Sequence, residues 1–346
     1  MDKRVTLSDI AKAAGVSKNT VSIVLRDRPG VSDSVRQRVL SLARDMNYER
    51  HPAQSVAAGK PKCIMILLPD SIGMYIRDST AETIGLIPRL YFKLQLFAQQ
   101  SGCIVVPYAL SLEEEKKCIL PPMLTSMTFT GVATMGCFSA DYLKALIDTG
   151  LNVVTVHEYI DGVESNAVTS DDVYAGYVMT EHLIQMGHRR IIYLGEKYYM
   201  AKYMDRWQGY CRAMSKHGLP IENNRYSEMP VHAQREDSEH KMLSETLSMQ
   251  HPMPTAIVCG EDFTAYRTSV VLKQMGYRVP EDVSLVGFDD VYRDDHNHDT
   301  YTSYRVDQDE IAQSALDLLL KPDRKPRKVI IYGEPVFRNS VRRIET

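Results

Sequence analysis

From Cys63 onward the chain alternates short apolar runs with amphipathic helical stretches, and this alternation most constrains its fold. The strand-like runs are "CIMILLP", "CIVVPYA", "GVATMG", "VVTVHE", "RRIIYLG", "PTAIVCG" and "VSLVGFDD". Because successive parallel strands need crossover helices, repeated β-α units predict a parallel sheet with helices on both faces. More than 270 residues of this pattern exceed one doubly wound sheet, so we expect two α/β subdomains.

The first sixty residues predict three short helices instead. Gly15 ends the first helix, Ser17 can cap the second, and Ser32 can cap the third. The positions expected to face inward are Leu7, Ile10, Ala11, Ala14, Val21, Val24, Leu25, Val35, Val39, Leu42, Ala43 and Met46. Helices this short are unstable alone, so we expect them to share a small core.

Two helices joined by a tight turn, the second beginning at a capped serine, form a helix-turn-helix. Such a second helix enters the major groove of DNA with its N-terminal half. Lys18, Asn19, Ser22 and Ile23 lie on the face away from the expected core. Lysine can donate to guanine, asparagine can pair with adenine, and isoleucine can contact a thymine methyl group. Helix periodicity alone leaves open an ordinary three-helix cap with a solvated face.

Charge is distributed unevenly along the chain. The net charge is −3, but residues 1–60 carry 11 Lys and Arg against 6 Asp and Glu. A small basic head on an acidic body suggests a polyanionic partner for the head. The 6 cysteines are scattered without a C-x-x-C pair, which favours reduced thiols over a disulfide frame or zinc site. With no apolar run of membrane-spanning length and no secretory signal, we expect a cytoplasmic, nucleoid-associated protein without membrane contact.

The segment "VTLSDIAKAAGVSKNTVSIVLRDRPGVSDSVRQRVLSLARDMNY" closely resembles the headpiece of LacI-family transcriptional regulators. The segments "ALIDTGLNVVTVHEYIDG", "TEHLIQMGHRRIIYLG", "RWQGYCRAMSKHGLP", "PTAIVCGEDFTA" and "GYRVPEDVSLVGFDD" resemble the regulatory domain of the same family. This resemblance implies an all-α helix-turn-helix headpiece joined to an α/β periplasmic-binding-protein-like domain. That domain would consist of two doubly wound parallel-sheet subdomains with a ligand between them.

The resemblance also implies the domain boundaries. We expect a DNA-binding headpiece at residues 1–49, a hinge helix or linker at 50–61, and an effector-binding and dimerisation domain at 62–346. The N-subdomain would comprise residues of about 62–168 and 300–332. The C-subdomain would comprise residues of about 169–299 and 333–346.

In the family, residues after the recognition-helix serine read bases, which here are Lys18, Asn19 and Ile23. The positions that match phosphate contacts are Thr6, Ser17, Thr20, Ser22, Ser32 and Tyr48. Family members insert a hinge leucine into the minor groove, but the matching residue here is Ala57, beside Val56. Weaker kinking or a Val56 wedge is one interpretation of this hinge, and phosphate contact alone is the other.

Positions that match the family's effector contacts are Asp70, Arg206, Asp262 and Asp289. Carboxylates and an arginine suit a polyhydroxylated ligand, because each hydroxyl both donates and accepts hydrogen bonds. Glu261 stands where asparagine is usual, so the effector can differ from a plain neutral sugar. For each carboxylate, a helix cap or a surface ion pair is the alternative.

The sequence therefore predicts a transcriptional regulator, most often a repressor in such a family, that binds a palindromic operator as a homodimer. A sugar-like small molecule would control it. No catalytic, phosphate-loop or metal motif is found, so we expect no enzyme activity, metal or cofactor. One alternative is a DNA-binding regulator without an effector, whose body serves as an interaction platform.

Overall fold

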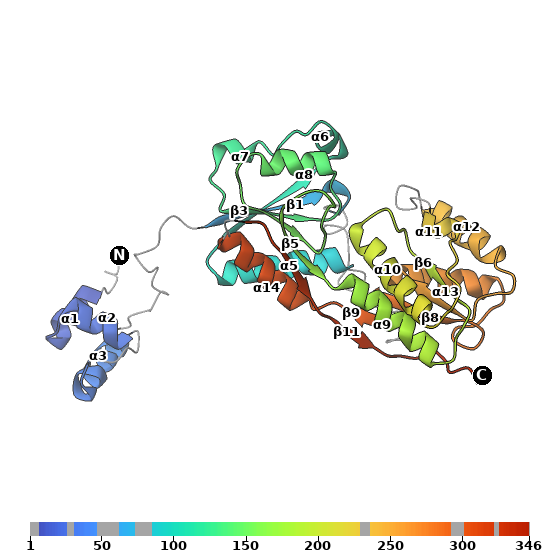
Figure 1. Ribbon diagram of the computed structural model, residues 1–346. Coiled ribbons are helices and arrows are strands. Elements are labelled where there is room, and N and C mark those ends of the chain that lie inside the picture. Colours follow the sequence, from blue (N-terminus) through green and yellow to red (C-terminus); the bar gives the residue numbers. More distant parts are fainter. Residues whose placement is uncertain are drawn as a thin grey trace. The chain divides into compact units, whose positions relative to one another are not determined.

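The computed structural model describes residues 7–25, 31–46, 62–72, 85–228, 236–291, 301–321 and 325–345. The chain divides into two compact units, Met1–Lys60 and Pro61–Thr346 (Figure 1). The first unit contains three helices and the second contains two sheets with their covering helices.

The small N-terminal unit confirms the three predicted helices. They are α1 (Leu7–Ala14), α2 (Lys18–Leu25) and α3 (Asp33–Asp45). Gly15 lies between α1 and α2 with φ +64, a conformation that glycine adopts without steric cost. Its buried core consists of Ile10, Ala11, Ala14, Val21, Val24, Val39 and Ala43. These apolar side chains from all three helices supply the packing that such short helices need.

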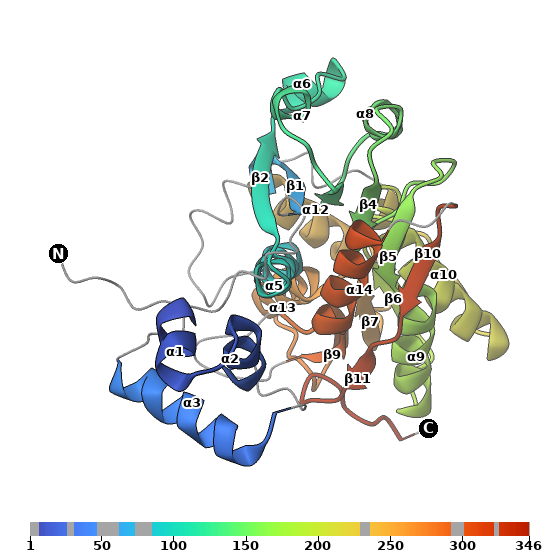
Figure 2. The ribbon, with the colours of Figure 1, turned by 90° about the vertical axis from the view of Figure 1, so that its left-hand side faces the viewer.

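The first sheet of the large unit has six strands in the order β10-β5-β4-β3-β1-β2, all pairing in parallel. The strands are β1 (Cys63–Pro69), β2 (Ile104–Leu110), β3 (Gly131–Met135), β4 (Val153–Val156), β5 (Asn166–Ser170) and β10 (Lys328–Ile331). The helices beside it are α5 (Leu86–Gln100), α6 (Leu112–Lys116), α7 (Met123–Ser126), α8 (Ala140–Ile147) and α14 (Gln308–Leu320). Helices α5 and α14 share one core with the sheet, and α8 shares a separate one. Figure 2 shows α14 beside β4 and β5.

The second sheet has the order β11-β9-β8-β7-β6, with only β11 antiparallel. Its strands are β6 (Ile191–Leu194), β7 (Ala256–Cys259), β8 (Ser284–Asp289), β9 (Thr302–Arg305) and β11 (Glu334–Val336). The accompanying helices are α9 (Asp172–Gln185), α10 (Ala201–Lys216), α11 (Arg225–Glu228), α12 (Glu236–Ser248) and α13 (Asp262–Gln274). Helices α9 and α10 pack on one face, and α12 and α13 on the other. Both subdomains are therefore doubly wound, as predicted.

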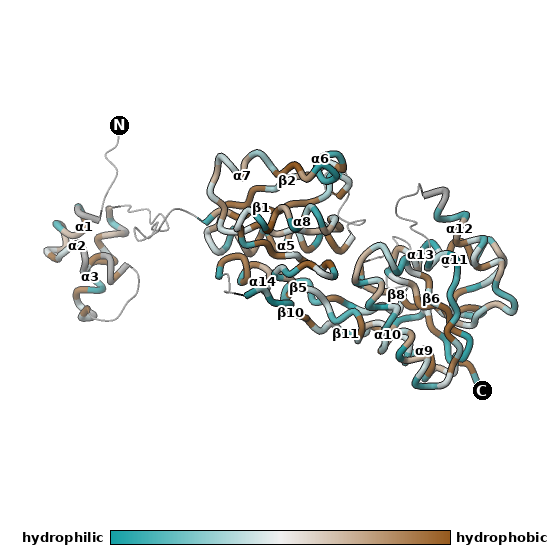
Figure 3. Tube along the Cα trace, turned by 45° about the horizontal axis from the view of Figure 1, so that its top comes forward, coloured by the Kyte–Doolittle hydropathy of each residue, from teal (hydrophilic) through white to brown (hydrophobic). Residues whose placement is uncertain are grey.

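Apolar residues concentrate in the strands of both subdomains, which run between the helical layers in Figure 3. Strands buried on both faces are typical of parallel sheets. In the described part of the chain, no helix has the length and apolarity needed to cross a membrane.

The chain passes between the two subdomains three times, after β5, after β9 and after β10. Strand β9 lies within the range 300–332 that we expected in the N-subdomain, but it pairs with β8 and β11 in the second sheet. The second crossing therefore follows Arg305. Polar Thr302 and Ser303 are fully buried there, so the segment lacks the apolar run by which the other strands were predicted.

Helices α9 and α10 lie side by side (Figure 1), so close that their backbones touch at two glycines. A Cβ atom on Gly176 would lie 2.1 Å from the carbonyl oxygen of Arg206, and one on Gly209 would lie 2.2 Å from that of Val173. Side chains do not fit at such distances, so the crossing requires glycine on both helices. It also fixes how close Arg206 lies to α9.

We expect Gly209→Ala to lower the free energy of unfolding by about 1–3 kcal/mol or more, because the added methyl group must push two backbones apart. Gln208→Ala, on the exposed side of the same helix, should stay within about 0.5 kcal/mol of the parent protein. Urea unfolding followed by circular dichroism measures both variants. If Gly209→Ala were as stable as Gln208→Ala, the helices would be able to separate without cost.

Candidate functional site

The loops that follow strands of the first sheet contact helix α10 of the second subdomain. The backbone N–H of Ala201 donates to Glu158 Oε1 at 3.1 Å, and Tyr159 Oη donates to Asp205 at 2.8 Å. Glu158 and Tyr159 come directly after β4. In open α/β sheets, ligands bind outside the carboxyl ends of the strands, so this contact marks the region of the candidate site.

A buried arginine organises the floor of this region. Arg206 is 0% exposed, and its Nε donates to Asp172 at 2.6 Å. One terminal nitrogen donates to Asp289 at 2.7 Å and the other to the carbonyl oxygen of Gly260 at 2.7 Å. Burial alone would lower the pKa of Arg206, but the two carboxylates raise it well above its usual value. The guanidinium is therefore cationic and fully paired, as a buried charge must be.

Asp289, one of the two carboxylates paired with Arg206, is also buried and ionised. Asp289 ends strand β8 with φ +91 and is 2% exposed. Burial opposes its ionisation, yet Arg206 and Lys202 lower its pKa below the usual value. A left-handed backbone at a residue other than glycine costs about 1–3 kcal/mol, and such residues cluster at functional sites.

The four predicted effector residues do not form one cluster. Arg206 and Asp289 are directly paired. Asp262 instead accepts hydrogen bonds from Ser303 Oγ at 2.7 Å and from the N–H of Val291 at 2.9 Å. Burial raises the pKa of Asp262 to about 7. Asp70 is half-buried after β1, and no described residue of the network forms a hydrogen bond with it.

Sequence reasoning missed several polar residues at this site, namely Asp172, His157, Glu158 and Lys202. Asp172 holds Arg206, and the other three are at most 5% exposed. His157 has φ +58 and follows β4 directly. The signal that could have found it is a pair of titratable residues placed immediately after a buried parallel strand.

The described residues of the headpiece agree with a capped second helix. Ser17 Oγ accepts a hydrogen bond from the N–H of Thr20 at 3.0 Å, so this hydroxyl caps α2. Lys18 is exposed, and Ser32 Oγ lies 3.3 Å from Ser34 Oγ. The remaining predicted DNA contacts lie outside the described residues, either wholly or in their side chains: Thr6, Asn19, Ser22, Ile23, Tyr48, Val56 and Ala57.

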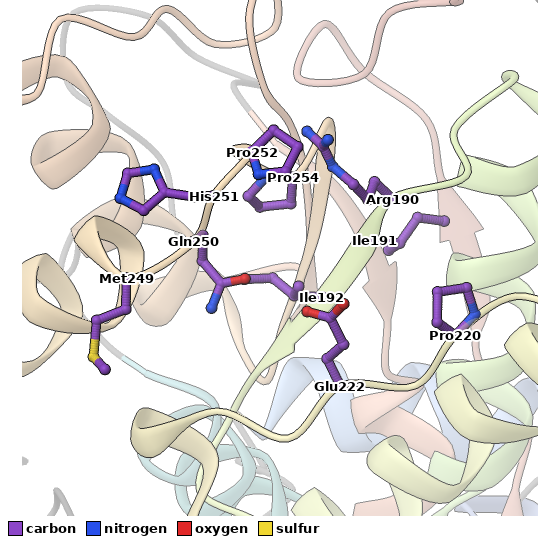
Figure 4. A pocket seen from close by; sticks show the side chains of 10 residues that line it. All are labelled: Arg190, Ile191, Ile192, Pro220, Glu222, Met249, Gln250, His251, Pro252 and Pro254. Carbon is purple, nitrogen blue, oxygen red and sulfur yellow. The ribbon is translucent and has the colours of Figure 1, made fainter.

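A hollow of about 180 Å³ lies near the amino ends of β6 and β7 (Figure 4). Ile191 and Ile192, at the start of β6, contribute to its lining. Asp289 ends β8 of the same sheet and therefore lies at its carboxyl edge, opposite the amino ends of β6 and β7. This hollow is therefore separate from the ion network.

A larger hollow of about 500 Å³ lies beside the crossings that follow β9 and β10. Its cations are already paired, because Lys93 contacts Asp309 at 2.6 Å, and Arg305 contacts Asp290 at 2.7 Å and Glu334 at 2.9 Å. The smaller hollow is lined in part by Arg190, whose Nε is buried without a hydrogen-bond partner among the described residues.

Two family models match the chain. Residues 6–51 match the model for bacterial regulatory proteins of the lacI family, and residues 180–341 match the periplasmic binding protein-like domain. The chain is 26% identical over 350 residues to the repressor PurR of Vibrio vulnificus, covering 98% of this chain and 99% of that protein. It is also 26% identical over 350 residues to the probable repressor ExuR of Bacillus subtilis, covering 99% and 100%.

Solved structures share this architecture. The lac repressor dimer bound to operator and the anti-inducer ONPF aligns with a TM-score of 0.65 at 21% identity, covering 98% of this chain and 100% of that one. The CelR–cellobiose complex aligns with a TM-score of 0.66 at 22% identity, covering 97% and 100%. These likenesses establish the fold.

The relatives are transcriptional repressors and not enzymes. The headpiece match, the periplasmic-binding-protein-like match and the full-length relatives agree with one another. The chain therefore matches DNA-binding transcriptional repressors of the LacI family in its headpiece, in its periplasmic-binding-protein-like domain and along its full length.

Proposed function

We propose that this repressor binds a palindromic operator as a homodimer and that a small polyhydroxylated molecule, bound where the two subdomains meet, controls its affinity for DNA. The observation that carries this proposal is the buried ion network of Arg206, Asp172 and Asp289 beside the contact between the subdomains. Solved relatives with similar folds hold cellobiose, sucrose and ribose. Dimer formation is supported by the operator-bound lac repressor dimer, which has the same fold.

In this proposal the N-terminal half of α2 reads the operator. Lys18, Asn19 and Ile23 contact base edges, while Thr6, Ser17, Thr20, Ser22, Ser32 and Tyr48 contact phosphates. The Oγ of Ser17 accepts the capping hydrogen bond from Thr20, so its O–H or its backbone N–H would donate to the phosphate. Val56 and Ala57 belong to the hinge that meets the minor groove. Two symmetric headpieces would match the two halves of a palindrome.

Control requires a ligand that prefers one arrangement of the subdomains. The subdomains meet through a few polar contacts, including those of Glu158 with Ala201 and of Tyr159 with Asp205. A ligand that binds between them would replace or reinforce such contacts. It would thereby shift the equilibrium between arrangements by its difference in affinity for them.

Selection of binding sites from random duplex DNA tests whether the protein recognises a palindromic operator. We expect a palindrome of about 14–20 base pairs, with an affinity that falls steeply as salt rises because bound phosphates release counterions. Lys18→Ala should weaken binding by about 1–3 kcal/mol and relax the preference at one position in each half-site. Gln37→Ala, on the exposed side of α3, is the matched control. Enrichment of no sequence by the full-length protein would contradict the proposal.

The allosteric part is tested by measuring both halves of one thermodynamic cycle. A ligand that changes operator affinity by a coupling of about 1–3 kcal/mol must have its own affinity changed by operator DNA to the same extent. Calorimetry with and without operator measures this reciprocity. If ligand affinity were identical in both titrations, control by the ligand would be excluded and the alternative of a body acting as an interaction platform would be favoured.

A further inference from the structure

A histidine without hydrogen-bond partners is buried where the subdomains meet. His157 is 0% exposed, and neither of its ring nitrogens has a hydrogen-bond partner among the described residues. The charged groups that act on its ring are Lys202, Asp172, Asp289 and Arg206, so the imidazole lies among them. Glu158 Oε2, from the next residue, is also buried without a partner in the described chain. Buried polar atoms without partners are rare in native proteins and call for an explanation.

The neighbouring lysine is equally unusual. Lys202 is 4% exposed in the first turn of α10, and the described residues offer its Nζ no ion pair or hydrogen bond. Its Nζ lies 5.2 Å from the centroid of the Tyr203 ring. Lys197, which is also 4% exposed, instead forms an ion pair with Glu228 and donates to Asn223 at 3.0 Å. Lys202 acts electrostatically on Glu158 and Asp289, but no ion pair joins its Nζ to either carboxylate in the described chain. An acidic ligand group can therefore supply a direct, charge-assisted partner for Nζ.

The carboxylates nearby are already committed to other partners. Asp172 and Asp289 hold Arg206, and Glu158 accepts from the N–H groups of Tyr159 and Ala201 with its other oxygen. Arg206 in turn has directed its Nε and both terminal nitrogens at protein oxygens. An incoming anion would therefore find its positive partner in Lys202 and not in Arg206.

The protonation states of the neighbouring groups suit an anion. Burial lowers the pKa of His157 to about 4, so the ring is neutral near pH 7 and offers one N–H donor. Burial raises the pKa of Glu158 to about 7, so its free oxygen is protonated in a large fraction of molecules and can donate as well. The first turn of α10 adds the favourable potential of a helix N-terminus, and no side chain caps it at Met200.

We propose that Lys202, His157 and Glu158 form a subsite for an acidic group, a carboxylate or a phosphate, carried by the polyhydroxylated effector. This inference rests on the effector site proposed above and deepens it by assigning the ligand's charge. The polyol part of the ligand would meet the remaining polar groups at the contact between the subdomains. The effector would then be an acidic sugar derivative and not a neutral sugar.

The test titrates full-length protein with glucose, galactose and mannose and with the uronate and the 6-phosphate of each. Binding is followed by the fluorescence of Trp207, the single tryptophan of the chain. Its ring contacts Tyr210 in α10 and Lys197 in the loop before α10. Calorimetry checks each result. At least one acid should bind about tenfold or more tightly than its neutral parent, as expected for one charge-assisted hydrogen bond. Uronates and phosphates identify which acidic group is preferred.

Lys202→Met should remove this preference while the neutral parent binds as before. Lys216→Met, at the exposed end of the same helix, should retain it. Without ligand, Lys202→Met should melt close to the temperature of the parent protein, because the described chain gives its Nζ no direct ion pair or hydrogen bond to lose. Operator binding confirms that each variant is folded.

Three results would overturn the inference: a neutral sugar that binds as tightly as its acids, no binding by any acid at millimolar concentration, or a Lys202→Met variant that melts well below Lys216→Met. The proposed function has a separate readout. A neutral sugar that changes operator affinity would leave the allosteric repressor standing while refuting the acidic effector. Acids that bind tightly without changing operator affinity would support the acidic subsite while refuting allosteric control by its ligand.

Discussion

The buried guanidinium of Arg206 is the interaction on which the second subdomain depends around the candidate site. A cation with no exposed surface is stable only when protein oxygens surround it, and here they come from α9, from the loop after β7 and from the end of β8. The glycine crossing of α9 and α10 brings Asp172 within reach. One side chain thus joins two helices to the carboxyl edge of the sheet.

This pairing also determines what remains for a ligand. Because the nitrogens of Arg206 are engaged, this arginine supports the site and orients Asp289, while both ring nitrogens of His157 lack hydrogen-bond partners among the described residues. The two subdomains touch through polar contacts and through Val291 and Phe263, which pack against the core of the first subdomain, and three chain crossings join them. Interfaces of this kind permit relative motion of their parts. The rigid ion network of Arg206 therefore lies next to a contact between subdomains that can move.

The sequence predicted those helices and strands whose pattern of apolar residues matches their burial. Helix spacing in the headpiece identified Ile10, Val21 and Val39, which are buried as expected, and apolar runs identified most strands. Strand β9 was placed in the wrong subdomain because the boundary at residue 300 came from the family resemblance, and the polar, buried Thr302 and Ser303 form no apolar run that could correct it. Family resemblance pointed to Arg206 and Asp289, but not to their contact with each other. Asp172 lies 34 positions before Arg206, and only the folded chain shows that it is the partner.

The three crossings have a consequence for how the protein is made. Helix α14 and strand β10, near the end of the chain, complete the first sheet and its core. The opening strands of the first subdomain leave the ribosome long before these elements, so that subdomain stays incomplete until Ile331 has been synthesised. The headpiece, whose core comes from residues before 47, can fold as soon as it emerges. During translation, the headpiece is therefore folded before the larger domain is complete.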